Sequence, residues 1–596
     1  MFKRTVCAEL YDFRINQDRQ INQFVKRDGR WQAIGQGEGF AQLEALGLGL
    51  RELGVKKGVP VAVISRTRLE WPYLDMAIMS IGGITVGIYD NLTSQDVGYI
   101  VEHSEACVVV VENQAMLDMH LEAILACPAV VKIVVIEDSQ PAKDSQLISY
   151  SQLIELGEKQ KQKAPDLFGQ LVDQVEPDDI ATYMYTSGTT GTPKGVILDH
   201  RNLYETATAS RGILPLEKDD VHLFFLPLSH ILQRMTTYIG TDGNFGSVYF
   251  AESLDKLVDN IAEVRPTVMT CVPRIFEKAH ARVMSRIETL NSRRQKIFTW
   301  ALGVGLQVSR LKQKKQPIPY FLTVKFKLAD RLVLSKIRAA LGGRPNFFAV
   351  GGAPLAKDLA EFFHACSIML LEGYGLSETS AVTCLNRPDS FKFGTVGRPV
   401  PGTEIRIAQD GEILIKGPGV FRGYLKDPQK TASVFEDGWF KTGDIGHLDQ
   451  DGFLVITDRK KNIIVTAGGK NIAPQKIENL IKLNPLISQV MVQGDRRSFL
   501  SAVITLDPEE LGLFAKLRGI ADCESRQLIN HPEVKNEVER AIEAANQKLA
   551  RFETIKKHAI LDKEFSVESG ELTPSLKVKR KVVTQRHQNI LDGFYE

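Results

Sequence analysis

Residues 185–196, Tyr-Thr-Ser-Gly-Thr-Thr-Gly-Thr-Pro-Lys-Gly-Val, constrain the fold of this chain more than any other stretch. The apolar run at 180–185 has the aromatic content of a buried strand, and 202–207 resembles the opening of a helix. We therefore predict a strand, a glycine-rich loop and a helix. Glycines let successive backbone N–H groups point inward, hydroxyls add donors and the lysine adds charge, so the loop suits phosphate. The residues expected to contact phosphate are Thr186, Ser187, Gly188, Thr189, Thr190, Gly191, Thr192 and Lys194.

The loop differs from the Walker A pattern, in which a Gly-Lys pair is followed by a Ser or Thr that binds magnesium. Here Lys194 comes six residues after Gly188 and is followed by Gly195. A surface turn is the alternative interpretation, but a turn does not need so many hydroxyls and a lysine beside a buried strand. The pattern therefore favours a phosphate loop of another class.

The loop closely resembles the signature of the adenylate-forming superfamily, which includes acyl-CoA synthetases, luciferases and the adenylation domains of peptide synthetases. The resemblance extends over most of the chain. Enzymes of that family join a carboxylate to the α-phosphate of ATP, release pyrophosphate and pass the acyl group to a thiol. The resemblance implies ATP, Mg²⁺ and coenzyme A as cofactor and co-substrates.

Composition indicates a globular protein without general affinity for nucleic acid. Apolar residues make up 43% of the 596 positions, charged residues 24%, and the net charge is +2. Seven scattered cysteines without metal spacing fit reduced thiols, so we expect a cytoplasmic protein. Residues 1–30 lack the apolar core of a signal peptide. The longest uncharged stretches, 76–89 and 297–309, are shorter than the roughly 20 residues that span a bilayer, so any membrane contact is expected to be peripheral.

Helix and strand patterns alternate from residue 31 to about 113, and strand patterns return at 221–226, 267–272 and 347–350. This alternation predicts an α/β fold with two doubly wound lobes. Short strands with Asp-Gly turns predict a small β subdomain near 394–457. We expect the large N-terminal domain to cover 1–458 and a small α+β C-terminal domain, mobile by inference, to cover 459–596.

His230 follows a predicted strand, at a position where open sheets bind ligands. In acyl-CoA synthetases the matching residue lies beside the carboxylate and the nucleotide. A surface or packed histidine remains an equal alternative on sequence grounds.

Two glycine-containing loops after predicted strands are suited to a nucleotide. The turn with Gly352, Ala353 and Pro354 allows close backbone approach to a flat ligand. The second loop offers an aromatic ring, a carboxylate and hydroxyls. The family uses its tyrosine to stack on adenine, its glutamate to bind Mg²⁺ and its threonine to contact phosphate. The second loop comprises Glu372, Gly373, Tyr374, Gly375, Ser377, Glu378 and Thr379, with Ser377 where threonine is commoner.

The family resemblance also assigns roles near the predicted domain boundary. Asp444 matches the ribose-binding aspartate, Arg459 lies at the ribose, and Lys461 matches the pivot of the hinge. The loop with Gly468 and Gly469 matches the part of the family that meets the thiol. The charge cluster at 458–462 is also compatible with a solvated linker.

The catalytic lysine of the family usually lies in a Pro-Lys-x-x-x-Gly-Lys context. Here Leu576 replaces the glycine and the spacing from Pro574 is shorter, as in long-chain members. Lys577 is the expected catalytic lysine, with Lys579 left open, and a simple basic tail is the alternative.

Residues 280–345 contain many lysines and arginines, few acids and interleaved apolar residues. Such a segment is suited to the surface of an anionic membrane, on its inner face, although a solvated helical insertion explains the composition equally well. The insertion resembles the one that distinguishes long-chain fatty acyl-CoA synthetases from relatives with shorter substrates.

The sequence therefore predicts ATP-dependent ligation of a long-chain fatty acid to coenzyme A, with Lys194, Glu378 and Lys577 as catalytic residues. One alternative is adenylation of another acid, or transfer to a carrier-protein thiol. The other is a nonenzymatic sensor of nucleotides, for which loss of Lys194, Glu378 or the terminal lysine would be expected, and all three are present. The oligomeric state does not follow from the sequence.

Overall fold

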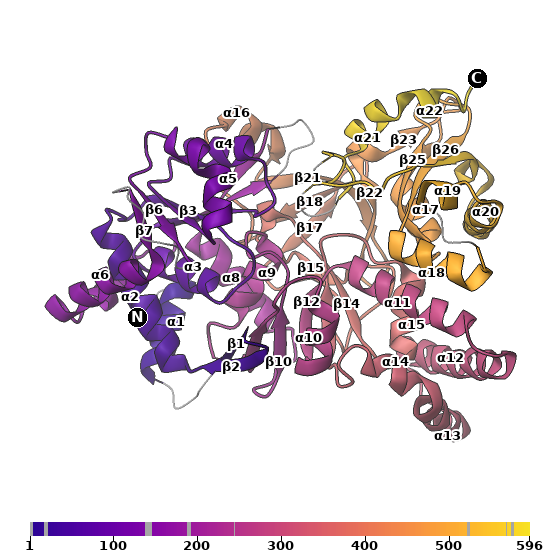
Figure 1. The fold of residues 1–596 in the computed structure, drawn as a ribbon, viewed down its shortest axis with the longest axis horizontal. Coiled ribbons are helices and arrows are strands. Elements are labelled where there is room, and N and C mark those ends of the chain that lie inside the picture. The colour runs from indigo at the N-terminus through magenta and orange to yellow at the C-terminus, as the bar shows by residue number, and fades with distance from the viewer. Residues whose placement is uncertain are drawn as a thin grey trace.

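The structure is a computed structural model that describes residues 4–16, 22–137, 146–186, 192–243, 245–520, 525–567, 569–573 and 577–596. It confirms the predicted arrangement of two α/β lobes, a β subdomain and a smaller C-terminal α+β domain (Figure 1). Among the described residues, no helix is long and apolar enough to cross a membrane.

The first lobe is built on an eight-stranded sheet in the order β19-β9-β8-β4-β3-β5-β6-β7. The six strands from β8 to β7 run parallel, and β9 and β19 are antiparallel additions at one edge. The strands are β3 Pro60–Ile64, β4 Ile84–Ile88, β5 Val108–Val111, β6 Lys132–Val135, β7 Leu147–Ser149, β8 Ile180–Thr186, β9 Lys194–Asp199 and β19 Gly423–Tyr424. Its helices are α2 Gln36–Glu52, α3 Glu70–Ser80, α4 Ser94–Ser104, α5 Gln114–Leu125, α6 Tyr150–Lys163 and α7 Leu167–Gln174.

One prediction in this lobe is wrong in detail. The phosphate loop leads from β8 into a second strand, β9, and the helix α8 (His200–Arg211) follows only after it. The segment at 194–199 alternates less clearly than a typical edge strand, so its pairing with β8 was not evident from the pattern.

The second lobe contains a nine-stranded sheet in the order β16-β15-β14-β13-β12-β10-β11-β1-β2. Its parallel centre carries antiparallel strands at both edges. The strands are β1 Gln23–Arg27, β2 Arg30–Ile34, β10 Val221–Phe224, β11 Ser247–Phe250, β12 Val268–Cys271, β13 Phe347–Val350, β14 Leu370–Tyr374, β15 Cys384–Leu385 and β16 Arg398–Pro399. Its helices are α9 Ile231–Ile239, α10 Leu257–Val264, α11 Pro273–Glu288, α12 Ser292–Gln313, α13 Tyr320–Ala329, a π-helix Asp330–Leu334, α14 Ser335–Ala339 and α15 Lys357–Ala365.

A fully buried ion pair joins the two lobes. Arg234 on α9 donates through Nε to Asp75 on α3 at 2.9 Å, and the Tyr238 hydroxyl donates to the same carboxylate at 2.7 Å. Arg234 also donates to the hydroxyl of Thr182 on β8 at 2.7 Å. Because every donor and acceptor here has a partner, the charges are tolerated in the core and fix how the lobes meet.

The β subdomain is an antiparallel sheet of β17 Glu404–Ile407, β18 Glu412–Lys416, β20 Phe435–Glu436, β21 Trp439–Leu448 and β22 Leu454–Arg459, with α16 Pro428–Val434 nearby. The C-terminal domain contains a short hairpin, β23 Ile464–Val465 with β24 Asn471–Ile472, and a three-stranded sheet, β25 Ile487–Gln493, β26 Leu500–Leu506 and β27 Ile555–Ile560. Its helices are α17 Pro474–Ile481, α18 Pro508–Arg518, α19 Ser525–Ile529, α20 Pro532–Asn546, α21 Arg580–Arg586 and α22 Gln588–Asp592.

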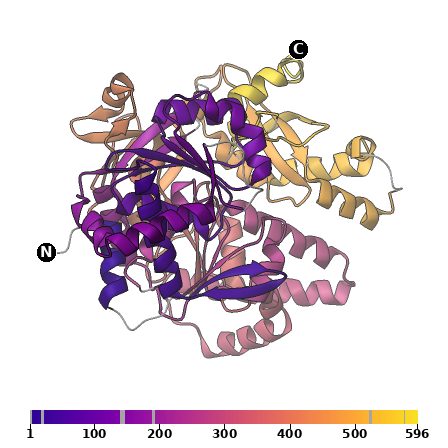
Figure 2. The same cartoon turned by 60° about the vertical axis from the view of Figure 1, so that its left-hand side comes forward.

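The C-terminal domain has its own apolar core. The two clusters of buried apolar residues in 464–594 contain no residue from before 459, and the other clusters contain none from after it. Figures 1 and 2 show this domain above the helices α11 to α15 in both views. Within the described part of the chain, the two domains therefore meet without a shared apolar cluster. The boundary at 458 stays a prediction.

Candidate active site

The two ends of the predicted phosphate loop are held together by strand pairing. Thr186 at the end of β8 pairs with Lys194 at the start of β9. Ser187, Gly188, Thr189, Thr190 and Gly191 lie outside the described residues. The arrangement positions the half-buried Lys194 at the base of the loop, beside Thr192.

Lys194 and Glu378 share one neighbour, Tyr424. The Tyr424 hydroxyl donates to Oε1 of Glu378 at 3.0 Å, and Nζ of Lys194 lies 5.6 Å from the centroid of the Tyr424 ring. An ammonium at this distance from a ring is attracted to its face. β19 places the tyrosine there, because Tyr424 pairs with Val196 on β9. Tyr424 therefore couples the positions of the expected phosphate-binding lysine and the expected metal-binding glutamate.

The loop that carries Glu378 is tightly built. A Cβ atom on Gly375 would lie 1.6 Å from the carbonyl oxygen of Ala381, so only glycine fits there. Ser380 and Ala381 adopt left-handed φ angles of 56° and 79°, which are strained for residues with a side chain. Strained backbone that is held by its surroundings is typical of functional loops.

Two hydroxyls of this loop differ in what they face. The Thr379 hydroxyl is buried and is bonded within the loop, accepting from the Leu376 N–H at 2.9 Å and from the Thr383 hydroxyl at 2.8 Å. Ser377 is only half-buried. The expected contact of Thr379 with phosphate stays a prediction, and Ser377 is the more accessible of the two.

The side chain of Glu372 holds the turn after β13 in place. Gly352, Ala353 and Pro354 are exposed, and Gly352 has a φ of +79° that favours glycine. The Glu372 carboxylate accepts the Leu355 N–H at 2.9 Å. Burial raises the pKa of Glu372 to about 8, against a smaller opposing effect of this hydrogen bond. The carboxyl group is therefore mostly protonated near pH 7 and supports the turn without adding a full charge.

Asp444 is held between an aromatic residue and an arginine. The Tyr374 hydroxyl donates to its Oδ2 at 2.7 Å, and Nε of Arg459 lies 3.1 Å from its Oδ1. Asp444 is buried on β21 opposite Arg459 on β22, so strand pairing brings the two together. Tyr374 packs in the apolar cluster of the β subdomain beside Gly373. Stacking of Tyr374 on adenine and contact of Asp444 with ribose stay predictions.

Lys577 from the C-terminal domain lies near Glu378, Asp444, Arg459 and Lys461, whose charges act on it, and the region that these residues border is here called the crevice. Its pKa is lowered to about 8, first because surrounding protein displaces water and then because of the charge of Arg459. Lys461 adds to this effect, whereas Asp444 and Glu378 oppose it. By surface area Lys577 is exposed, so the protein that surrounds it lowers the pKa without closing the side chain off from solvent.

Lys579 is placed differently from Lys577. The Lys577 carbonyl accepts the Thr573 N–H at 2.8 Å. Two residues later, the Lys579 N–H donates to the Glu571 carbonyl at 2.8 Å, and Lys579 precedes α21. The charges of Arg459, Asp444, Lys461 and Glu378 act on Lys577. The choice of Lys577 over Lys579 as the catalytic lysine stays a prediction.

His230 is the N-cap residue of α9. Its Nδ1 accepts the Leu232 N–H at 3.1 Å. Burial, and then the charge of Lys577, lower its pKa to about 4. The ring is therefore neutral at pH 7 and carries its proton on Nε2, which makes it a hydrogen-bond donor. Gly87 on β4 lets this loop approach the first lobe, because a Cβ there would lie 3.1 Å from the Ser229 Cα.

The crevice carries an excess of positive charge. Lys194, Arg459, Lys461 and Lys577 contribute cations, whereas Glu378 and Asp444 contribute carboxylates. Lys461 has its pKa lowered to about 8, by burial and then by Arg459, with Lys194 also contributing. Such an excess stabilises a bound polyanion, and a nucleoside triphosphate fits this requirement.

A magnesium ion is compatible with the donors present. Among the described residues, no group of three His, Cys, Asp or Glu side chains is placed to hold a metal ion by itself. Mg²⁺ in nucleotide enzymes is usually held by one or two carboxylates together with substrate phosphates and water. The partly accessible Glu378 therefore fits as the protein ligand of a metal that arrives with ATP.

The loop of Gly468 and Gly469 is separate from this cluster. It is an exposed turn between β23 and β24, and the Ala467 N–H donates to the Arg497 carbonyl at 2.9 Å. In the contacts recorded for the described residues, this loop contacts its own domain and does not reach Lys194 or Glu378. The structure thus brings Lys577 to the crevice and leaves the glycine loop outside it.

Sequence reasoning missed Tyr424 as part of the site. The residue lies 230 positions from Lys194, in a strand of two residues, Gly423–Tyr424. No periodic pattern marks so short a strand. The available signal was the aromatic residue directly after the glycine in a segment otherwise typical of loops.

Comparison with known proteins agrees with this geometry. The family model described as AMP-binding enzyme matches residues 16–425, and the model described as AMP-binding enzyme C-terminal domain matches 461–596. Long-chain-fatty-acid–CoA ligase FadD15 of Mycobacterium bovis is 38% identical over 571 residues, covering 95% of this chain and 93% of the relative. Long-chain-fatty-acid–CoA ligase ACSBG1 of Homo sapiens is 34% identical, covering 96% and 82%.

Solved structures share the fold over nearly the whole length. The anthranilate CoA ligase AuaEII, in complex with anthranoyl-AMP, has a TM-score of 0.75 at 18% identity and covers 99% of both chains. ATP-bound MatB from Rhodopseudomonas palustris has a TM-score of 0.68 at 22% identity, again over 99% of both chains. Because one family model covers most of the chain and relatives match almost all of it, the chain belongs to the AMP-binding enzyme family.

Proposed function

We propose that this protein ligates a long-chain fatty acid to coenzyme A with ATP, through an acyl-adenylate. The observation that carries the proposal is the convergence of Lys194, Glu378, Asp444 and Lys577 on one crevice. The names and the length coverage of the relatives support the substrate class. The carboxylate oxygen of the acid attacks the α-phosphorus, the bond to pyrophosphate breaks, and the CoA thiol then displaces AMP from the acyl carbon.

Residues of the crevice act mainly by positioning the reactants and neutralising charge. Lys194 and the loop of 186–192 hold the terminal phosphates, and Lys577 stabilises the negative charge that grows around the α-phosphate. Asp444 and Arg459 orient the ribose. His230 donates its Nε2 proton as a hydrogen bond to the acid. Bound Mg²⁺ supplies further neutralisation of the phosphates through Glu378.

The two half-reactions require different surroundings for the acyl group. Lys577 lies near Asp444 and Glu378, while the loop of Gly468 and Gly469 lies outside the crevice. We propose that the C-terminal domain rotates about Lys461 after adenylation, withdrawing Lys577 and presenting this loop to the thiol.

The test is release of pyrophosphate over saturated acids of increasing length, with and without CoA. We expect activity to rise with chain length and thioester to appear only with CoA. Activity confined to short or aromatic acids would contradict the substrate class. Adenylate formation with thioester formed only on a carrier-protein pantetheine would favour the alternative acceptor.

The insertion carries a surface that fits an anionic membrane. On α13 and the π-helix, Tyr320, Val324, Leu328 and Leu332 recur every fourth residue and are 85%, 51%, 51% and 43% exposed. This spacing places them on one helix face beside Phe321, which is 65% exposed. The same insertion carries exposed cations, here called the basic rim: Arg293, Arg294, Lys296, Lys312, Lys314, Lys315, Lys325, Lys327, Arg331 and Lys336.

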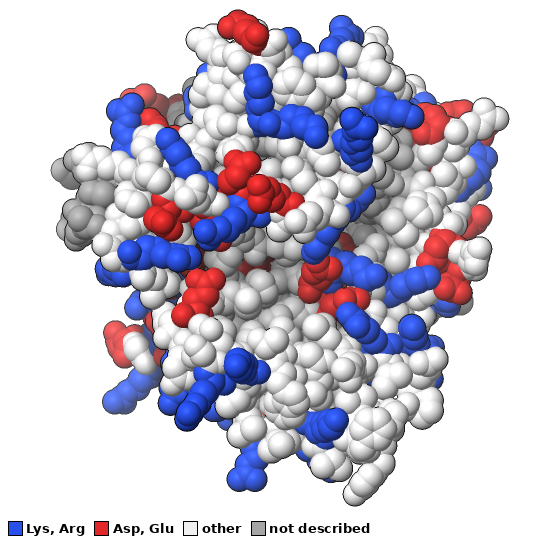
Figure 3. All heavy atoms as spheres, turned by 90° about the vertical axis from the view of Figure 1, so that its right-hand side faces the viewer, with Lys and Arg blue, Asp and Glu red and all other residues white. Residues whose placement is uncertain are grey.

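Some cations of the insertion have other roles. Arg338 pairs with Asp330 at 2.9 Å, and Arg282 pairs with Glu509 of the C-terminal domain at 3.4 Å. Figure 3 shows the side with α12 and α13, where basic side chains outnumber acidic ones in the lower third, among uncharged atoms. We propose that this apolar stripe and its basic rim bind an anionic bilayer peripherally.

Sedimentation with vesicles tests the proposed contact. Replacing Lys312, Lys314 and Lys315 with glutamine should weaken binding to anionic vesicles, by on the order of 1 kcal/mol per charge, and salt should do the same. The matched control is Lys159→Gln with Lys163→Gln on α6, at the opposite end of the molecule (Figure 1). Equal loss in the control, or salt-insensitive binding, would contradict the proposal.

A further inference from the structure

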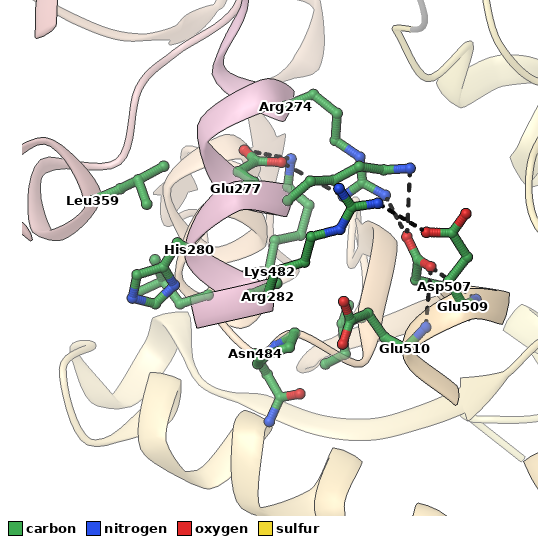
Figure 4. A pocket seen from close by; sticks show the side chains of 15 residues that line it. Arg274, Glu277, His280, Arg282, Leu359, Lys482, Asn484, Asp507, Glu509 and Glu510 are labelled. Carbon is green, nitrogen blue, oxygen red and sulfur yellow. Dashed lines mark hydrogen bonds and ion pairs between the residues drawn. The ribbon is translucent and has the colours of Figure 1, made fainter. Parts of the chain in front are cut away.

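A group of charged side chains joins α11 of the large domain to the start of α18 in the C-terminal domain. Its members, here called the interdomain ion cluster, are Arg274, Lys278, Arg282 and Ser285 on α11, with Ser488, Asp507, Glu509 and Glu510 opposite. Figure 4 shows Arg274 and Arg282 extending from the helix toward Asp507 and Glu509. The cluster is outside the crevice, and nothing in the proposed chemistry uses it.

Arg274 is the centre of the cluster. Its guanidinium donates to the Ser488 hydroxyl at 2.9 Å and to the Ser488 carbonyl at 3.3 Å, and lies 3.4 Å from Oδ2 of Asp507. Glu277 on its own helix lies 3.6 Å away and keeps the arginine extended. Its guanidinium also lies 3.9 Å from Oε1 of Glu564. One side chain thus contacts three separate segments of the C-terminal domain: the strand β25, the start of α18 and the segment with Glu564.

Asp507 both pairs with Arg274 and caps the helix α18. Its Oδ1 caps α18 by accepting the Glu509 N–H at 3.1 Å, which leaves Oδ2 for the arginine. The Asp507 side chain is 9% exposed and that of Arg274 is 25% exposed. Water screens this pair less than a surface pair. It therefore stabilises the contact between the two domains more than the outer pair Arg282–Glu509 does, whose side chains are 52% and 72% exposed.

The cluster matters because the domains share no apolar core. Lys577 belongs to the C-terminal domain, and its place beside Asp444 depends on how that domain rests on the large one. Outside the hinge, most of the hydrogen bonds and ion pairs between described side chains of the two domains belong to this cluster. A polar interface without an apolar core opens at low cost.

We infer that Arg274 is a positioning residue for adenylation, which holds the C-terminal domain so that Lys577 stays in the crevice. The expected change in the rate of adenylation rests on the proposed function. The expected change in the arrangement of the two domains does not depend on the substrate. Release of the cluster is then needed before the thiol step, since Lys577 must leave the crevice.

The test compares Arg274→Met, which keeps the length and removes the charge, with Arg274→Lys, which keeps the charge. In the full-length protein, Arg274→Met should slow adenylate formation about tenfold and leave thioester formation from synthetic acyl-adenylate and CoA unchanged or faster. Arg274→Lys should recover most of the rate. Arg310→Met, at an exposed arginine of α12, is the matched control and should change neither step.

Paired spin labels on α12 and α20 report the domain arrangement without catalysis. Arg274→Met should lengthen the interdomain distance or broaden its distribution, and 0.5 M salt should have the same effect on the unmodified protein. Arg274→Lys should give the same distance distribution as the unmodified protein. Equal loss of both half-reactions, or an unchanged distance in Arg274→Met, would overturn the inference. A distance change in a protein that activates no fatty acid would uphold the positioning role and refute the proposed function instead.

Discussion

At the scale of single residues, side chains of the site set the positions and the pKa values of their neighbours. Tyr424 holds Glu378 through its hydroxyl and Lys194 through its ring. Lys577 has a lowered pKa because protein and other cations surround it. Both effects prepare the crevice for a polyanion, because the bound phosphates supply the negative charge that the free site lacks.

The first residue-scale prediction distinguishes the two terminal lysines. Lys577→Ala should slow adenylate formation about 100- to 1,000-fold, by analogy with the loss of one oxyanion donor, because its charge acts on the transition state. It should leave thioester formation from synthetic acyl-adenylate intact. Lys579→Ala is the matched control, and a selective adenylation defect in that variant alone would refute the assignment.

The second residue-scale prediction concerns pH. Lys577 must be protonated to neutralise the α-phosphate, and its pKa in the free enzyme is lowered to about 8. As pH rises through 8, kcat/KM for ATP should therefore fall, whereas below 7 this group should have no effect. Phosphates raise the pKa once ATP is bound, so kcat should fall only at higher pH. A pH profile of kcat/KM that stays flat from 7 to 9.5 would contradict this role.

At the scale of elements, short connections place groups from distant parts of the chain. The exposed turn between β23 and β24 holds Gly468 and Gly469 away from the crevice, and Gly469 has a φ of +71°. The insertion contributes to two surfaces, because Arg282 and Ser285 on α11 contact the C-terminal domain while α13 presents its apolar stripe to solvent.

The element-scale prediction concerns Gly468 rather than Gly469, because only Gly469 has a left-handed φ angle. Gly468 has no left-handed φ, and its nearest atom to an added Cβ is the Thr466 hydroxyl oxygen at 3.9 Å. Gly468→Leu should therefore fold normally, spare adenylate formation and slow thioester formation, because the side chain obstructs pantetheine. Both half-reactions are followed separately, with Gly512→Leu on α18 as a control at an open glycine. Normal thioester formation in Gly468→Leu would exclude the turn from the thiol path.

At the scale of the whole molecule, the two lobes are joined firmly and the C-terminal domain loosely. The lobes share a large apolar cluster and the buried pair Arg234–Asp75. The C-terminal domain is attached by the hinge and by the interdomain ion cluster. This difference allows one domain to move while the crevice between the lobes keeps its shape.

The whole-molecule prediction is that calorimetry shows two unfolding transitions. Arg234→Met should lower the stability of the large domain by about 3 to 5 kcal/mol, because Asp75 is left charged and buried without its partner. The transition of the C-terminal domain should not shift. The double variant with Asp75→Leu removes both charges and should recover part of the loss. A single transition that shifts as a whole would show that the domains unfold together.

Much of the fold followed from local patterns in the sequence. The alternation of helix and strand predicted the two lobes, and the strand patterns at 221–226, 267–272 and 347–350 correspond to β10, β12 and β13. Such patterns succeed because a buried strand or an amphipathic helix is specified by neighbouring residues. The motifs around Glu378, Asp444 and Lys577 were likewise recognisable within a few residues of sequence.

The sequence by itself determined the elements, the charged motifs and the family resemblance. Only the tertiary structure decided that β1 and β2 join the sheet of the second lobe, that Tyr424 links Lys194 to Glu378, and that Arg274 contacts Ser488 and Asp507. These contacts join residues that are 46 to 233 positions apart, through a few hydrogen bonds, ion pairs or ring contacts. The sequence around a single charged or aromatic residue has no periodic pattern that indicates its partner. The partner is decided only when the packed cores bring the two surfaces together.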